Sequence, residues 1–269
     1  MLEALSHEFM RNALYAGLLA SATCGVIGAL VVVNRLAFLS GGIAHAAYGG
    51  VGMAFFFGFS PLLGTLGFSL AAALVMAGIT LRSKGRSDTV VGVLWAAGMA
   101  AGVIFADLTP GYPADLMSYL FGSILTVGHE DLWVMGTMCA GVLFVAVFWH
   151  NDLLALSYDP DFARLRGVPV TFLHFLLLCM IALAVVMLVR VVGLILIVAF
   201  LTIPPYMAEQ WTSSLARVMA LSALLCAVFT VTGLAVSYAL NLTSGASIIL
   251  VAAAAFFADL AVARLRQNA

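Results

Sequence analysis

The chain alternates between long apolar stretches and short polar interruptions, and the stretches have the length that a lipid bilayer requires. A membrane-spanning helix needs about 17–25 predominantly apolar residues. Nine stretches fit this requirement: residues 11–33, 38–59, 62–81, 89–107, 132–149, 170–189, 191–207, 217–238 and 247–263. The pattern therefore predicts an all-α polytopic membrane protein with about nine transmembrane helices. No long polar stretch separates them, so residues 1–269 are expected to form one transmembrane domain.

Two segments depart from this simple pattern. Residues 114–128 are amphipathic and too short to cross comfortably, so we expect a re-entrant or interfacial segment whose backbone is covered by protein or water. Pro204 and Pro205 fall inside the seventh stretch, where they should interrupt the helix and free carbonyl groups. Such a break could gate the inner end of a transport path, with Glu209 beyond it. A plain kink at a helix end explains the same residues equally well.

The composition agrees with a membrane protein and excludes a soluble domain, because 64% of the residues are hydrophobic and only 9% are charged. The N-terminal residues lack the basic region and the cleavage site of a signal peptide. The four cysteines lie singly in apolar stretches, without Cys-x-x-Cys spacing: Cys24, Cys139, Cys179 and Cys226. We expect them to be buried side chains rather than disulfides or metal ligands.

The distribution of charge predicts the orientation. By the positive-inside rule, the basic residues at 82–86 form a cytoplasmic loop, which puts the N-terminus outside and the C-terminus inside. Nine of the eleven basic residues then lie inside: Arg35, Arg82, Lys84, Arg86, Arg164, Arg166, Arg217, Arg264 and Arg266. The outer side keeps two basic and six acidic residues. An acidic outer surface would concentrate cations, although ordinary solvated surface charge explains it too.

One ionisable residue, His45, lies near the middle of an apolar segment that is rich in small residues. Because residues four apart share a helix face, two stripes form: Gly41, His45, Gly49 and Met53 on one, and Gly42, Ala46 and Gly50 on the other. The second stripe lets a neighbouring helix approach closely. An ionisable group within a membrane span is a functional-site hypothesis by default. The alternative is that His45 donates one hydrogen bond to a neighbouring helix and does nothing else.

The longest polar connection, residues 150–167, has the features of a short capped helix. Asp159 can serve as the N-cap, Pro160 can occupy the first helical position and Gly167 can end the helix. Phe162 and Leu165 would then be available to a cytoplasmic partner. An ordinary amphipathic loop is the alternative.

Enzyme motifs are missing from the sequence. His129 and Glu130 lack the second histidine that a zinc-protease helix carries one turn later. No glycine-rich phosphate-binding loop occurs, so ATP hydrolysis is not expected on this chain. We expect the chain itself to be neither an enzyme nor the carrier of a bound cofactor.

Several segments carry a family resemblance in their order and spacing: residues 35–38 followed by 40–46, 119–124, 158–167, 192–197 followed by Ile203 and Pro204, and 233–246. Through them nearly the whole chain resembles the permease subunits of ABC-type zinc/manganese/iron importers, a family related to the cobalamin and siderophore permeases. The resemblance implies a type II ABC importer-like fold in the inner (cytoplasmic) membrane and a homodimer around a central path. It also implies cytoplasmic ATPase subunits and an extracytoplasmic metal-binding protein as partners, and a divalent metal ion as the transported substrate.

The resemblance also implies roles for particular residues. The helix after Asp159 is similar to the coupling helix that sits in a groove of the ATPase, and four residues would shape that contact: Asp159, Pro160, Ala163 and Gly167. Many family members carry Asp and His one turn apart in the second span, where they are thought to hold the ion. His45 matches the histidine, whereas Gly41 stands at the aspartate position.

An imidazole alone is a modest ligand, because Zn²⁺, Mn²⁺ and Fe²⁺ normally take two or more N, O or S donors. In a homodimer two copies of His45 could meet, and Tyr48, Met53 or water could complete the shell. Weak binding suits transport, so Gly41 would shift selectivity rather than abolish transport. Asp107, at the outer end of the fourth stretch, is the second candidate for a cation contact.

Two other functions fit the same sequence. A permease for a metal chelate, siderophore or cobalamin would need a wide, largely apolar path rather than convergent donors. A stand-alone channel or ion-coupled carrier would move its ion without ATP and without a partner ATPase.

Overall fold

The computed structural model describes residues 7–82, 87–110 and 116–267, and every regular element within these ranges is helical. In chain order the elements are α1 (Glu8–Val33), α2 (Ala37–Phe57), α3 (Pro61–Arg82), α4 (Ser87–Leu108), α5 (Leu116–Phe121), η2 (Ile124–Thr126), α6 (His129–Phe148), α7 (His150–Tyr158), α8 (Pro160–Leu165), α9 (Val170–Val191), η3 (Leu194–Leu196), α10 (Ile197–Trp211), α11 (Leu215–Leu240) and α12 (Ser244–Gln267). The expectation of an all-α protein is confirmed.

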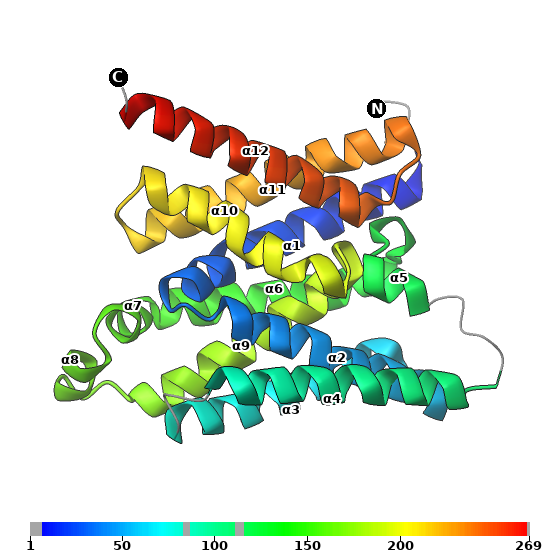
Figure 1. Cartoon of the computed structure of the whole chain (residues 1–269), viewed down its shortest axis with the longest axis horizontal. Helices are drawn as coiled ribbons and strands as arrows, with labels where there is room; N and C mark the ends of the chain where they lie inside the picture. Colours follow the sequence, from blue (N-terminus) through cyan, green and yellow to red (C-terminus); the bar gives the residue numbers. More distant parts are fainter. Residues whose placement is uncertain (1–6, 83–86, 111–115, 268–269) are drawn as a thin grey trace.

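The long helices lie side by side along the length of the molecule, and the two ends of the chain lie at opposite ends of it (Figure 1). Eight of the described helices are long and apolar enough to cross a membrane. The helix α2 runs between them as a ninth, so the prediction of about nine spans in a multi-pass membrane protein is confirmed.

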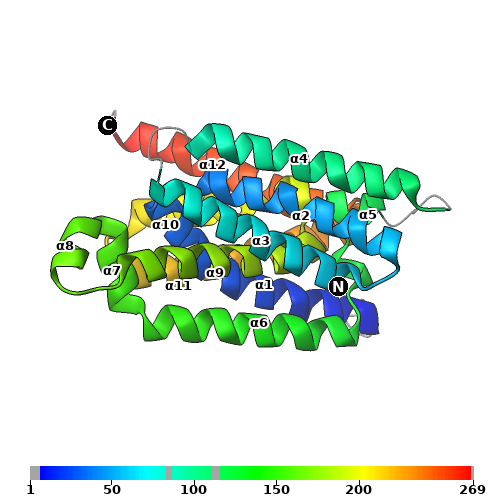
Figure 2. The same cartoon turned by 90° about the horizontal axis from the view of Figure 1, so that it is seen from below.

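The helix α2 is not among these eight helices, and it is surrounded by protein. Its 21 residues give a length of about 31 Å, close to the thickness of the hydrocarbon core. In Figure 2 it lies between α3 and α4, and it also packs against α9 and α10. Most of its residues are buried. A helix shielded from lipid does not need lipid-facing apolar side chains, and glycines and a histidine are tolerated in it.

Small residues allow the close contacts of α2. Gly50 meets Gly64 of α3 backbone to backbone, and Ala46 is covered by Gly98 of α4. No side chain would fit between these helices, since a Cβ on Gly98 would lie 2.5 Å from the Cα of Ala46. The small-xxx-small stripe predicted for this segment therefore contacts α3 and α4, as expected for tightly packed membrane helices.

The segment between α4 and α6 does not cross the bundle. Its described part consists of two short helical pieces, α5 and η2, at the end of the bundle where α4 ends and α6 begins (Figure 1). Ile124 of η2 is fully buried, and η2 packs against α1 and α12. This confirms the expectation of a re-entrant or interfacial segment; residues 114–115 lie outside the described ranges.

Three glycines join distant parts of the chain at this end. Gly122 follows α5, Gly193 precedes η3 and Gly245 lies in the first turn of α12. Gly122 and Gly193 touch through their backbones, and a Cβ on Gly245 would lie 2.6 Å from the carbonyl oxygen of Phe121. Three segments that carry the family resemblance, 119–124, 192–197 and 233–246, therefore meet in space.

The structure corrects the prediction of a break at Pro204 and Pro205. Helix α10 continues through both prolines to Trp211, and the discontinuity lies earlier, at Gly193 and η3. The carbonyls that the prolines free are covered by α1. The Cys24 thiol donates to the carbonyl oxygen of Phe200 at 3.1 Å, and Gly28 allows α1 to approach the carbonyl of Leu201. The helix is therefore stabilised from outside at its two prolines.

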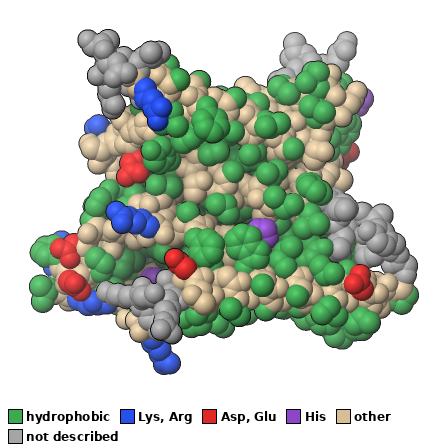
Figure 3. Space-filling view, viewed as in Figure 1, with side chains coloured by type: hydrophobic (Ala, Val, Ile, Leu, Met, Phe, Trp, Pro, Cys, Tyr) green, Lys and Arg blue, Asp and Glu red, His purple; other side chains and the backbone are tan. Residues whose placement is uncertain are grey.

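Charged side chains are distributed unequally between the two ends. Figure 3 shows the arginines of this face gathered at the end where α7 and α8 lie. The opposite end carries an ion pair between Arg190 and Asp131 at 3.3 Å, with Arg190 5.2 Å from the centre of the Tyr119 ring. This asymmetry is what the positive-inside rule predicts if α7 and α8 are cytoplasmic. The basic residues Lys84 and Arg86 lie outside the described ranges.

Candidate functional site

His45 lies near the middle of α2 and stacks on an aromatic ring of α4. Its imidazole lies face to face with the indole of Trp95, with ring centroids 3.9 Å apart and an interplanar angle of 7°. The two rings meet because α2 and α4 run parallel and in close contact, so that Gly42 faces Val91 and Gly52 faces Gly102. Only 8% of the His45 surface is exposed.

The imidazole has no hydrogen-bond partner in the part of the chain that the structure describes. Its Nδ1 atom is buried and unpaired. A buried polar atom without a partner is costly and rare in folded proteins. The hypothesis that His45 only donates a hydrogen bond to a neighbouring helix is therefore not supported, and the ring remains available to a ligand that the single chain does not contain.

The space beside Gly41 explains why a side chain is absent there. A Cβ on Gly41 would lie 2.9 Å from the Cγ2 atom of Val198 in α10 and 3.7 Å from the Cζ3 atom of Trp95. A side chain at this position would therefore press on the Val198 methyl group and lie against Trp95. Neither residue was singled out by sequence reasoning, since both are ordinary apolar residues of their helices.

The described residues contain no group of three or more His, Cys, Asp and Glu side chains that could hold a metal ion. Asp107 is exposed near the end of α4, and its twelve-residue separation from Trp95 corresponds to about 18 Å along the helix. The structure therefore does not bring Asp107 together with His45. Tyr48 is buried against Gly102 of α4. Among the described residues of one chain, His45 therefore belongs to no such group.

Pro204 and Glu209 lie on α10, on the side of Val198 that leads away from η3. Pro204 is buried and Glu209 is exposed near the end of the helix. About 16 Å of helix separates Glu209 from Val198, the residue of α10 that lies beside Gly41. Glu209 and His45 therefore do not form one site. The role of Pro204 and Glu209 as a gate stays a prediction.

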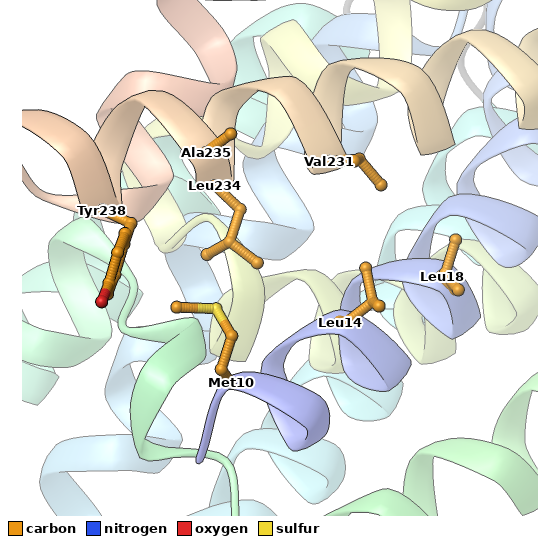
Figure 4. Close-up of a pocket in the computed structure, with 7 residues that line it drawn as sticks. All are labelled: Met10, Leu14, Leu18, Val231, Leu234, Ala235 and Tyr238. Atoms are coloured by element: carbon orange, nitrogen blue, oxygen red, sulfur yellow. The ribbon is translucent and has the colours of Figure 1, made fainter. Parts of the chain in front are cut away.

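An apolar cavity lies between α1 and α11, away from His45. It has a volume of about 250 Å³ and is shown in Figure 4 with the residues that line it: Met10, Leu14, Leu18, Val231, Leu234, Ala235 and Tyr238. The surface of the cavity is almost entirely apolar. The cavity lacks the convergent donors that a bare cation needs.

The short capped helix predicted at residues 159–167 is present as α8. The Asp159 carboxylate accepts a hydrogen bond from the backbone N–H of Phe162 at 2.9 Å, and Pro160 is the first helical residue. Gly167 ends the helix with a φ of +80°, and the N–H of Val168 donates to the Ala163 carbonyl at 3.0 Å. This is the Schellman pattern.

The surface of α8 is suited to contact a partner. Phe162 and Leu165 are 52% and 87% exposed, whereas Ala163 is fully buried against the rest of the chain. The preceding helix α7 is hydrogen-bonded to the end of α1. The side-chain amide of Asn34, directly after α1, donates to the Ser157 hydroxyl of α7 and to the Leu30 carbonyl of α1, each at 2.8 Å. Sequence reasoning missed this anchor, which holds α8 in place through α7.

Comparison with known proteins assigns the fold to a family. A family described as "ABC 3 transport family" matches residues 6–263. The chain is 47% identical over 264 residues to the membrane protein slr2045 of Synechocystis sp., covering 98% of this chain and 94% of that protein. It is 32% identical over 256 residues to the manganese import system permease protein ScaB of Streptococcus gordonii, covering 95% of this chain and 92% of that protein.

A solved structure agrees with these matches. PsaBC from Streptococcus pneumoniae in complex with Fab superposes on this chain with a TM-score of 0.86 at 30% sequence identity, covering 96% of this chain and 93% of that chain. The resemblance read from the sequence is thereby confirmed: the chain belongs to the ABC 3 transport family.

Proposed function

We propose that the chain is the membrane-spanning permease subunit of an ATP-driven importer of divalent metal ions, with manganese as the first cargo to test. The observation that carries this proposal is the buried imidazole of His45, whose Nδ1 atom has no hydrogen-bond partner among the described residues. The similarity to ScaB, which is named a manganese import system permease protein, supports the choice of metal. Zinc and iron are the other candidate cargoes.

The translocation path would form between two copies of the chain. A single copy supplies one imidazole and no cluster of three or more ionisable ligands among its described residues. A two-fold axis would double the donors, and water could complete the coordination shell. Such a sparse shell binds an ion weakly, which allows it to leave the site.

ATP hydrolysis would take place on a separate cytoplasmic subunit that docks on α8. Helix α8 packs against α9, and α9 in turn contacts α2 and α3. The Thr80 hydroxyl and the His174 Nε2 atom share a hydrogen bond of 2.8 Å between α3 and α9. A displacement of α8 by the ATPase would therefore reach α2, where His45 lies, through α9. An extracytoplasmic metal-binding protein would deliver the ion to the opposite end.

The proposal is tested by transport in proteoliposomes that contain the permease with its partner ATPase and binding protein. We expect uptake of Mn²⁺ only when ATP and both partners are present. Uptake by the permease alone would contradict the proposal and indicate a channel or an ion-coupled carrier. Stronger uptake of a chelated metal than of the free ion would indicate the other alternative, a chelate permease.

The N-cap of α8 gives a prediction about the ATPase contact. Replacing Asp159 with alanine removes the hydrogen bond to Phe162 and should destabilise α8 by about 1 kcal/mol. Because the exposed Phe162 and Leu165 side chains depend on this helix, we expect a several-fold loss of metal-stimulated ATP hydrolysis in the complex. The melting temperature of the permease alone should change little.

Two variants serve as controls for this prediction. Asp159→Asn keeps a good N-cap and should restore hydrolysis. Asp161→Ala removes only the exposed ion pair with Arg164, which contributes little to stability, and should have a small effect. Equal losses in Asp159→Asn and Asp159→Ala would show that the carboxylate charge, not the cap, is needed.

A further inference from the structure

A groove with a basic mouth lies between α3, α8 and α9. It has a volume of about 620 Å³, and its wall is mainly apolar, with Val75 and Gly78 on α3 and Phe175 on α9. Two arginines line the same groove: Arg82, the last residue of α3, and Arg164 of α8. The groove is distinct from the His45 region and from the exposed Phe162 and Leu165 surface of α8.

The positive charge at the mouth is only partly compensated. Within the part of the chain that the structure describes, Arg82 forms no ion pair. Arg164 contacts Asp161 through one nitrogen at 2.8 Å, and both side chains of this pair are well exposed, so water weakens the attraction. Thr171, in the first turn of α9, also lines the groove, and the N-terminus of that helix adds partial positive charge.

The apolar part and the basic part follow one another along α3. The stretch from Leu74 to Arg82 extends for about 12 Å, which is most of the depth of one leaflet of the hydrocarbon core. Leu74 and Val75 are about half exposed, so the groove is open to lipid along this side. Its mouth lies at the α8 end, which the charge distribution assigns to the cytoplasm. Basic pockets between helices on this side of a membrane attract anionic headgroups.

We propose that this groove binds an anionic phospholipid of the cytoplasmic leaflet, with its phosphate between Arg82 and Arg164 and an acyl chain along Val75 and Gly78. Because Arg164 belongs to α8, the lipid would hold α8 against α3 and α9. A consequence that rests on the proposed function is that metal-stimulated ATP hydrolysis by the complex would increase with the fraction of anionic lipid.

Binding is tested on the full-length permease in detergent by adding phosphatidylglycerol or phosphatidylcholine and measuring the melting temperature. A ligand that binds only the folded state raises this temperature. We expect phosphatidylglycerol to raise it by several degrees and phosphatidylcholine to have little effect. The double variant Arg82→Gln/Arg164→Gln should lose most of the difference between the two lipids.

A matched pair of glycine variants tests the acyl-chain part. No atom lies within 4 Å of a Cβ on Gly78 or on Gly67, and both glycines belong to α3. Gly78→Leu would fill the groove and should abolish the phosphatidylglycerol effect. Gly67→Leu places the same side chain outside the groove and should retain it.

Four results would overturn the proposal. Equal effects of the two lipids would show that the charge is not recognised. An equal effect of inorganic phosphate, or an effect that survives Gly78→Leu, would indicate a site for a soluble anion. Loss of the effect when the partner ATPase is bound would indicate that the mouth is a protein contact. Since the readout is stability and not transport, its failure leaves the proposed function intact.

Discussion

Replacing Gly193 with alanine is expected to prevent accumulation of the folded protein in the membrane. Gly193 has φ +82° and ψ 163°, a conformation that is essentially restricted to glycine. A Cβ there would overlap the backbone of Gly122 and Phe121 and lie 2.6 Å from the carbonyl oxygen of Leu120. Strain and overlap together would cost about 2–6 kcal/mol, which is a large part of the stability of a typical protein.

The measurement is the amount of protein in the membrane fraction and its melting temperature in detergent. Gly58→Ala is the control for a positive φ without overlap: Gly58 lies in the left-handed region, with φ +73° and ψ 28°, and has no atom within 4 Å of its Cβ position, so its strain is smaller than that at Gly193. Gly136→Ala, in the open surface of α6, should be neutral or slightly stabilising. If Gly193→Ala melts like Gly58→Ala, the backbone contact with Gly122 does not contribute as argued.

The same contact explains why the discontinuity of the seventh span could not be located from the sequence. Proline removes a donor and frees carbonyls, and this local effect predicted a break at Pro204. The outcome depends on what covers the freed carbonyls, and Cys24 and Gly28 do so from α1, more than 170 residues away along the chain. The break at Gly193 depends likewise on a partner, Gly122, from another part of the chain.

Features that depend on residues close together in the sequence were predicted correctly. The length of the apolar stretches predicts the spans, because the thickness of the bilayer sets the length of every helix that crosses it. Capping is equally local, so Asp159, Pro160 and Gly167 predicted α8 with its ends. For α2 the small residues predicted tight contacts, but its position between α3 and α4 required the structure.

The candidate site combines features set by residues close in the sequence with contacts between distant segments. His45 stands out in the sequence because an ionisable residue in a membrane span is unusual. Trp95 and Val198 do not stand out, and they reach His45 and Gly41 only through the register of α4 and α10 against α2. Hydrophobic periodicity predicts which face of a helix is buried, but it does not predict which residues of two helices lie opposite each other.

Replacing His45 with alanine is expected to lower ATP-dependent Mn²⁺ uptake by at least about tenfold, because it removes the buried imidazole proposed to bind the ion in α2. The permease should still fold, since the variant also removes a buried nitrogen that lacks a partner. Uptake is measured in the proteoliposomes described above, for Mn²⁺, Zn²⁺ and Fe²⁺. Unchanged uptake of all three metals would exclude His45 from the mechanism.

A second variant separates ligation from packing. His45→Phe keeps a flat ring that can stack on Trp95 but has no nitrogen. If His45 binds the ion, His45→Phe and His45→Ala should lose uptake to a similar extent. If the ring only packs against the indole, His45→Phe should transport like the natural protein.

Position 41, one helical turn from His45, allows the lost metal-binding group to be replaced. In the His45→Ala background, Gly41→Asp would introduce a carboxylate one turn away, and Val198→Ala would remove the methyl group that lies 2.9 Å from its Cβ. We expect this triple variant to recover part of the uptake and to change the order of preference among the three metals, because a carboxylate is a harder ligand than an imidazole and favours Mn²⁺ over Zn²⁺. Gly41→Asp without Val198→Ala should recover less, since Val198 still occupies the space. Failure of both variants, with the protein folded and the ATPase bound, would show that a carboxylate at position 41 does not replace the imidazole of His45.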